Sequence, residues 1–167
     1  SSDLSEQALR EIYFPAFETA VKKAQPWTVM CSYNRINGIY ASENPWLLTR
    51  VLREEWGFEG LVMSDWGAVS NRVKGLAAGM DLEMPGSNGA NDEQIVEAVR
   101  SGRLPQEQLD QAVERILNLI FRHTANRRKE SFDREADHQK AADIARQCMV
   151  LLKNQQVLPL KQEERVA

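Results

Sequence analysis

The chain has 167 residues, of which 27% are charged and 43% hydrophobic, and its formal net charge is −3 at pH 7. This length is enough for one domain with its own core, and the composition is ordinary for a globular chain. The small negative charge argues against a nucleic-acid-binding surface, and no apolar run reaches the length of a membrane span.

The first predicted element is a helix that ends near Gln25-Pro26. Asp3 is the expected N-cap, with Glu6 three residues later, and Pro15 is expected to kink or split the helix. The 3-4-3-4 spacing of one buried helical face is met by Leu9, Ile12, Tyr13, Ala16, Phe17, Ala20 and Val21.

Two strands and a helix are predicted next. Residues 28–33 and 60–65 are short apolar runs without polar alternation, which is typical of strands covered on both faces in a parallel sheet. Between them, an Asn-Gly pair closes a loop over 34–38, and the apolar spacing predicts a helix over 45–56.

The chain continues with a short helical stretch over 69–78 and a third short strand over 80–84. Two more helices are expected at about 92–100 and 106–122. The apolar face of the second comprises Leu109, Val113, Ile116, Leu117 and Ile120.

Strands that alternate with helices indicate an α/β fold with a parallel sheet and right-handed crossovers. Three short parallel strands with flanking helices leave two open sheet edges. Residues 1–123 are therefore expected to be the C-terminal portion of a (β/α)8 TIM-like barrel, incomplete as a domain. The polar segment 124–137 predicts a linker, and 138–167 predicts a helix followed by the start of a strand near Arg165.

The cysteines and histidines give no sign of a metal site. Cys31 and Cys148 lie far apart beside apolar residues, which favours two buried reduced thiols, although one disulfide stays open as an alternative. His123 and His138 stand in polar surroundings without a Cys or His at ligand spacing, so no metal is expected.

Asp65 is the first candidate for catalysis. The run 61–63 brings it to the carboxyl end of a predicted parallel strand, which is where barrel enzymes hold their catalytic groups. Trp66 follows directly, and an aromatic ring beside a carboxylate suits a sugar. The alternative interpretation is that Asp65 only caps the helix that begins after Gly67.

Three other side chains have two open interpretations each. Asp81 and Glu83 are two residues apart and therefore lie on the same face of the third predicted strand. They either both point at the same mouth of the barrel or hold loops by hydrogen bonds. Tyr33 ends a strand and either donates its hydroxyl to a ligand or fills the core. A glycosidase needs two carboxyl groups, and spacing alone does not pair them.

Several long motifs resemble one enzyme family. Residues 29–38, VMCSYNRING, resemble the VMxSYNxxNG segment of glycoside hydrolase family 3, and residues 55–66, EWGFEGLVMSDW, resemble its EWGFxGxVxSDW signature. Residues 9–13, 79–86 and 150–154 also fit, in the same order. The resemblance implies a (β/α)8-like barrel followed by an α/β sandwich, whose first elements would lie in 138–167.

The resemblance also implies an activity, which is the hydrolysis of terminal non-reducing β-D-glucosyl residues of β-glucosides or cello-oligosaccharides, with retention and without a cofactor. Asp65 would be the nucleophile, with Tyr33 in the sugar subsite and Trp66 at the aglycone entrance. Met30 and Arg35 would shape or support the pocket. An ionised Asp65 needs a hydrogen-bond donor beside it, which Tyr33 or an arginine could supply.

By the same resemblance, the general acid/base would be a Glu beyond Ala167, and a Lys-His pair that grips glucose would lie before Leu9. The isolated chain is therefore expected to be inactive and to self-associate as a dimer through open sheet edges and uncovered helix faces. No nucleic-acid or membrane partner is expected, and likeness to bacterial enzymes suggests a cytoplasmic location. A β-xylosidase or other exo-β-glycosidase, and a non-catalytic sugar-binding or structural module, stay open as alternatives.

Overall fold

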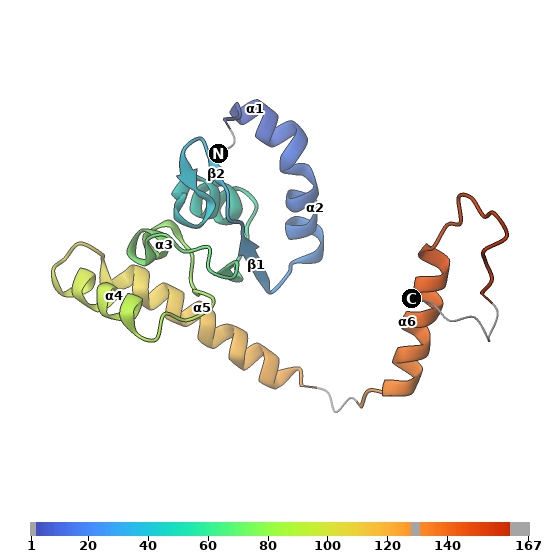
Figure 1. The fold of residues 1–167 in the computed structure, drawn as a ribbon. Helices are drawn as coiled ribbons and strands as arrows, with labels where there is room; N and C mark the ends of the chain where they lie inside the picture. The colour runs from blue at the N-terminus through green and yellow to red at the C-terminus, as the bar shows by residue number, and fades with distance from the viewer. Residues whose placement is uncertain (1–2, 128–130, 161–167) are drawn as a thin grey trace. The chain divides into compact units, whose positions relative to one another are not determined.

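The structure, a computed structural model, describes residues 3–127 and 131–160. The chain divides into two units, Ser1–Arg127 and Arg128–Ala167. In Figure 1 the first unit holds helices packed around a short sheet, and the described residues of the second unit include the helix α6. The first unit is an α/β arrangement with few parallel strands.

Three consecutive helical segments open the first unit: α1 (Glu6–Ala8), η1 (Leu9–Tyr13) and α2 (Pro15–Ala24). The side chain of Ser5 accepts a hydrogen bond from the backbone N–H of Ala8, so the expectation of a cap at Asp3 is wrong. Pro15 is the first residue of α2, where its missing N–H costs no helical hydrogen bond. The predicted split at Pro15 is confirmed.

A π-helical turn at η1 changes which residues face the core. Its hydrogen bond runs from the N–H of Phe14 to the carbonyl of Leu9, five residues back. Because this turn holds one extra residue, the side chains after it are rotated about the helix axis. Phe14 is therefore buried, whereas Ile12 and Phe17, expected in the buried face, are exposed.

The parallel sheet consists of β1 (Thr28–Cys31) and β4 (Leu61–Ser64), which pair in register from Thr28 opposite Leu61 to Cys31 opposite Ser64. The expected third strand over 80–84 is wrong. Only Leu82 joins the sheet, as an isolated parallel bridge to Met63, because the backbone of the following residues bonds to the Ser64 side chain and to Gly67 instead.

The Asn-Gly pair closes a hairpin where a loop was expected. Strands β2 (Arg35–Ile36) and β3 (Ile39–Tyr40) are antiparallel, and the two residues between them, Asn37 and Gly38, have φ values of 50° and 85°. Positive φ at both positions is the geometry of a type I′ turn, which matches the twist of the strands it joins. A short 3-10 segment, η2 (Ala41–Glu43), follows.

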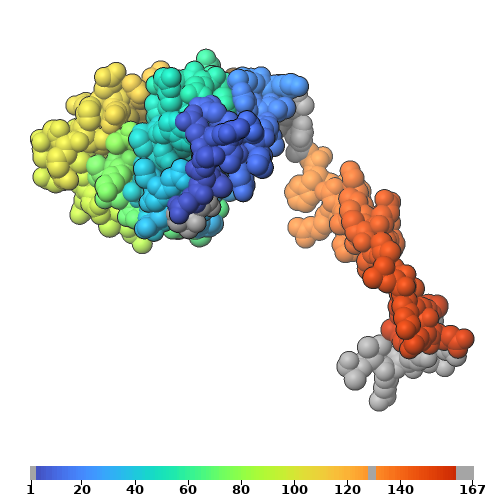
Figure 2. Space-filling view, turned by 90° about the horizontal axis from the view of Figure 1, so that it is seen from above, coloured from blue at the N-terminus to red at the C-terminus, as the bar shows by residue number. Residues whose placement is uncertain are grey.

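The helix η3 (Trp46–Glu55) contributes three buried side chains to the core around the sheet. It buries Leu48, Val51 and Leu52, and Trp56 directly after it packs edge-on against Phe14 with ring centroids 5.5 Å apart. In Figure 2 the blue N-terminal helices lie against the cyan segment that includes η3. The same cluster includes Val62 of β4, so the sheet and both helical segments share one core.

The remaining helices of the first unit are α3 (Arg72–Ala78), α4 (Ala90–Arg100) and α5 (Gln106–Ala125), which form a second core. Its buried members are Leu76, Ile95, Ala98, Leu104 and Ala112. The expected apolar face of α5 is covered only near its N-terminal end, and Ile120 is 51% exposed.

The second unit contains the helix α6 (Arg134–Cys148), whose N-cap Asp133 accepts hydrogen bonds from two backbone N–H groups. α6 thus begins inside the segment expected to be a linker, 124–137. Cys148 is exposed, so its expected burial is wrong, while Cys31 is buried, and both thiols are free. The strand expected near Arg165 lies outside the described residues.

Candidate active site

Asp65 lies directly after β4, at the carboxyl end of the parallel pair. Its backbone N–H bonds to the carbonyl of Cys31, the last residue of β1, so the backbone hydrogen bonds between the two strands extend to Asp65. The N–H of Ala68 bonds back to the carbonyl of Asp65 and closes a turn that holds Trp66 and Gly67. The predicted strand-end position is therefore confirmed, and Asp65 is partly buried.

The side chain of Asp65 is held through one of its two oxygens. The hydroxyl of Tyr33 lies 3.0 Å from Oδ1, and the backbone N–H of Trp66 donates to the same atom at 2.6 Å. Among the described residues, both donors to this carboxylate end on Oδ1. Oδ2 is therefore the oxygen available to a reacting atom.

Tyr33 is also tied to the turn beyond Asp65. Its hydroxyl lies 2.8 Å from the carbonyl oxygen of Trp66, so one phenolic proton has two acceptors within reach. The hydrogen bond to Asp65 is the main cause that raises the pKa of Tyr33, so the phenol keeps its proton at neutral pH. Of the two donors considered from the sequence, Tyr33 is the one that the structure places beside Asp65.

The alternative interpretation of Asp65 as a helix cap is wrong. The next helix, α3, is capped by Asn71, whose Oδ1 accepts from the backbone N–H of Lys74 at 2.9 Å. Five residues lie between this cap and Asp65. The Asp65 carboxylate therefore does not cap the helix that follows it.

The other predicted binding residues, Trp66, Met30 and Arg35, have different surroundings. Trp66 is 65% exposed and Met30 58% exposed, so both present apolar surface to solvent. Arg35 lies on β2, where its guanidinium stacks over the ring of Tyr40 at 4.2 Å from the centroid. The structure thus joins Tyr33, Asp65 and Trp66 by hydrogen bonds, while Arg35 stacks within its hairpin.

Two supports of the turn were not found in the sequence. The hydroxyl of Ser42 donates to the carbonyl of Ala68 at 3.1 Å, and the carboxylate of Glu43 accepts from the backbone N–H of Asn71 at 2.8 Å. Both lie on η2, so this short segment fastens the chain between Asp65 and α3. Sequence spacing gave no signal for a contact between Ser42 and a loop 26 residues away.

Asp81 holds the fold together, as its structural interpretation predicted. Its side chain is 1% exposed and accepts from Arg53 at 2.7 Å, from Arg115 at 2.9 Å and from the N–H of Val62 at 2.8 Å. Burial is the main cause that lowers the pKa of Arg53, and the charge of Asp81 opposes it. One carboxylate thus connects η3, α5 and β4.

Glu83 also serves the fold. Its carboxylate accepts from the side-chain amide of Asn91 at 2.7 Å and lies 3.9 Å from Arg72. Asp81 and Glu83 therefore do not join Asp65 as a catalytic pair.

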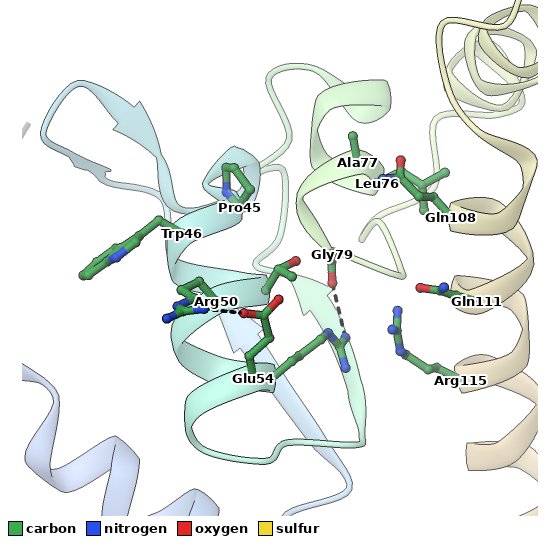
Figure 3. Close-up of a pocket in the computed structure, with 12 residues that line it drawn as sticks. Pro45, Trp46, Arg50, Glu54, Leu76, Ala77, Gly79, Gln108, Gln111 and Arg115 are labelled. Atoms are coloured by element: carbon green, nitrogen blue, oxygen red, sulfur yellow. Dashed lines mark hydrogen bonds and ion pairs between the residues drawn. The ribbon is translucent and has the colours of Figure 1, made fainter.

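Two pockets open elsewhere on the first unit. One, of about 420 Å³, lies between η3, α3 and α5, and in Figure 3 Gln111 and Arg115 face Arg50 and Glu54 across it. The other, of about 590 Å³, is lined by Asp81, Glu83 and one face of α5. Neither is lined by Asp65.

In residues 3–127 and 131–160, no group of three or more His, Cys, Asp or Glu side chains gathers where it could hold a metal ion. Within the same ranges, every helix is too short or too polar to cross a bilayer.

The fold and the site define an α/β domain that presents a partly buried carboxylate at the carboxyl end of a parallel strand. Residues 1–119 match the family model described as the glycosyl hydrolase family 3 N terminal domain. The chain belongs to glycoside hydrolase family 3.

Curated relatives and solved structures agree with this assignment. The chain is 55% identical over 166 residues to thermostable beta-glucosidase B of Acetivibrio thermocellus, with 98% of this chain and 22% of that protein covered. It is 53% identical over 160 residues to an exo-alpha-(1->6)-L-arabinopyranosidase of Bifidobacterium breve, with 94% of this chain and 21% of that protein covered.

Among solved structures, the GH3 beta-glucosidase of Bifidobacterium adolescentis is similar to this chain with a TM-score of 0.78 and 52% identity. The match covers 95% of this chain and 24% of that one. The chain thus spans between a fifth and a quarter of the length of these relatives.

Proposed function

We propose that the complete protein hydrolyses terminal β-D-glucosyl residues from β-glucosides by a retaining mechanism, with Asp65 as the nucleophile. The observation that carries the proposal is the geometry of the Asp65 carboxylate. Tyr33 and the N–H of Trp66 hold Oδ1, while Oδ2 is left for attack. Similarity to beta-glucosidases over nearly the whole chain supports the substrate class.

In the first step, Oδ2 of Asp65 forms a bond to the anomeric carbon as the bond to the leaving oxygen breaks. The leaving oxygen takes a proton from a general acid, and the aglycone departs. Water then attacks the anomeric carbon, gives its proton to the same group, and breaks the ester to Asp65. Two inversions give overall retention.

The acid/base group belongs outside this chain in the proposed mechanism. In retaining enzymes, the two carboxyl groups lie about 5 Å apart. The two carboxylates that the sequence suggested beside Asp65, Asp81 and Glu83, accept hydrogen bonds from Arg53 and Asn91. The proposal therefore assigns the acid to a part of the complete protein that this chain does not include.

The remaining residues would hold the sugar. Tyr33, which reaches both Asp65 and the Trp66 carbonyl, would border the glucosyl subsite. The exposed ring of Trp66 would stack on the aglycone, and Met30 would add apolar surface beside them. Arg35 would act through the hairpin, since its guanidinium stacks on Tyr40.

The test is hydrolysis of an aryl β-glucoside by the complete protein and its Asp65→Asn variant. The matched control is Asp110→Asn, which changes an exposed carboxylate on α5. The proposal expects a loss of at least about 10³-fold in kcat for Asp65→Asn, since attack requires a charged oxygen, and no loss for Asp110→Asn. Equal turnover by Asp65→Asn and the wild type would exclude the nucleophile role.

A second candidate is another exo-glycosidase activity of the same family. It is favoured by the Bifidobacterium breve relative, an exo-alpha-(1->6)-L-arabinopyranosidase that is 53% identical to this chain. Relatives that are named for different sugars are thus about equally similar to this chain over the aligned residues. Comparison of kcat/KM of the complete protein on aryl β-glucoside, β-xyloside and α-L-arabinopyranoside separates the candidates.

We also propose that residues 1–123 form the C-terminal part of a (β/α)8-like barrel and that the isolated chain is inactive. The parallel pair of β1 and β4 and the similarity to the Bifidobacterium adolescentis structure support the barrel. Inactivity follows from the missing acid. Detectable turnover of an aryl β-glucoside by the purified chain would contradict it.

The isolated chain is further proposed to dimerise through the uncovered apolar face of α5. Four side chains make up this face: Val113, Leu117, Ile120 and Phe121, all of them exposed. Sedimentation equilibrium should show a dimer of the wild-type chain and a monomer of the Leu117→Glu/Ile120→Glu variant. A wild-type chain that stays monomeric across concentrations would exclude the dimer.

A further inference from the structure

The turn that carries Asp65 is fastened to a segment 20 residues further along the chain. Ser64, the residue before Asp65, is fully buried at the end of β4. Its hydroxyl accepts from the backbone N–H of Met84 at 2.7 Å and donates to the carbonyl of Met84 at 3.1 Å. One side chain thus satisfies both backbone groups of Met84.

The other end of the turn reaches the same residue. The backbone N–H of Gly67 donates to the carbonyl of Met84 at 2.8 Å. Gly67 has a φ of 77°, so the chain reverses there in a conformation that side-chain-bearing residues rarely adopt. Ser64 and Gly67 bracket Asp65 and Trp66, and both are bonded to Met84.

We propose that Ser64 is a positioning residue for Asp65, which rests on the proposed nucleophile role of that carboxylate. The hydroxyl of Ser64 bonds to the backbone of Met84, and it acts by fixing the backbone on which Asp65 and Trp66 stand. Attack on an anomeric carbon is sensitive to small displacements, and an error of 1 Å can cost about 10²-fold in rate. Without the Ser64 hydroxyl, Met84 releases one end of the turn.

The test measures ester formation directly in the complete enzyme. The probe is 2,4-dinitrophenyl 2-deoxy-2-fluoro-β-D-glucopyranoside, whose fluorine slows both steps while its leaving group departs without acid assistance. The first-order inactivation constant reports attack by Asp65, and the half-saturating probe concentration reports binding. For Ser64→Ala, the proposal expects the inactivation constant to fall at least about tenfold while the half-saturating concentration stays within about threefold.

The matched control is Thr49→Val, which removes a comparable hydroxyl bond, from Thr49 Oγ1 to the carbonyl of Ala78 at 2.9 Å, away from the turn. Both variants should lose similar thermal stability, and only Ser64→Ala should lose inactivation rate. Equal inactivation rates of Ser64→Ala and the wild type would overturn the positioning role.

Two further results distinguish failure of the positioning role from a folding defect and from failure of the proposed nucleophile role. If Ser64→Ala yields no folded enzyme, the Ser64→Thr variant is measured in its place, since it keeps the hydroxyl. Its inactivation constant should lie within about threefold of the wild-type value, and a loss of about tenfold would overturn the proposal. A wild-type enzyme that the probe does not label would instead refute the nucleophile role of Asp65.

Discussion

The hydroxyl of Tyr33 lies 3.0 Å from Oδ1 of Asp65 and joins the segments that follow two neighbouring parallel strands, β1 and β4. The same hydroxyl lies 2.8 Å from the carbonyl of Trp66. When Asp65 is charged, the phenolic proton can face the carboxylate, and when Asp65 is esterified it can turn to the carbonyl. Tyr33 thus has an acceptor in either state of the proposed nucleophile.

Tyr33→Phe should lower kcat/KM of the complete enzyme by about 10- to 100-fold, because a hydrogen bond to a charged group contributes about 1.5–3 kcal/mol. Steady-state kinetics on an aryl β-glucoside measures this. Tyr40→Phe is the control, since it keeps the ring on which Arg35 stacks. A Tyr33→Phe enzyme as active as wild type would show that the hydroxyl does not support the reaction.

The ionisation of Tyr33 should depend on Asp65. The hydrogen bond to Asp65, burial and the carboxylate charge together raise the pKa of Tyr33, so its phenolate should form at higher pH than that of an ordinary tyrosine. In Asp65→Asn the negative charge is gone, and the pKa should fall back. NMR of chains labelled with ¹³C at Cζ of tyrosine follows each phenol separately, and an unchanged Tyr33 titration in Asp65→Asn would contradict the coupling.

Asp81→Asn should destabilise the chain by about 3 kcal/mol, because removal of one partner of a buried ion pair leaves the other charge uncompensated. Arg53 and Arg115 both lose their shared carboxylate, while the new amide oxygen can still accept from Val62. Urea-induced unfolding gives the free energy. Asp110→Asn on the surface should change it by less than about 0.5 kcal/mol, and a similarly small change for Asp81→Asn would refute the account of this carboxylate.

Gly60→Ala should cost about 2 kcal/mol of unfolding free energy, since a Cβ there would lie 2.4 Å from the carbonyl oxygen of Trp27 and 2.7 Å from the Phe58 ring. The displaced backbone also leads into β4. Gly86→Ala is the control, because its Cβ would meet no atom within 4 Å. Thermal unfolding compares the two, and equal stability would show that the backbone relaxes around Gly60.

The sequence predicted the position of Asp65 because an apolar run before a polar residue is a reliable mark of a strand end. It also predicted the split at Pro15 and the turn at Asn37-Gly38, where backbone chemistry decides the conformation. The roles of Tyr33 and Trp66 came from the family resemblance and not from spacing.

Long-range contacts explain what the sequence could not predict. The prediction of a third strand was wrong because the hydroxyl of Ser64 forms hydrogen bonds with both backbone groups of Met84. No local sequence pattern indicates this long-range contact. The predicted buried face of the first helix was wrong because the π turn before Phe14 shifts the helical period by one residue. The supports from Ser42 and Glu43 join residues more than 25 positions apart.

The most direct test of the nucleophile assignment is the site of covalent labelling. The complete enzyme is inactivated with 2,4-dinitrophenyl 2-deoxy-2-fluoro-β-D-glucopyranoside, digested, and mapped by tandem mass spectrometry. The account predicts one fluoroglucosyl ester, carried by Asp65. An ester on any other residue, or a stable enzyme that turns over β-glucosides without forming an ester, would contradict it.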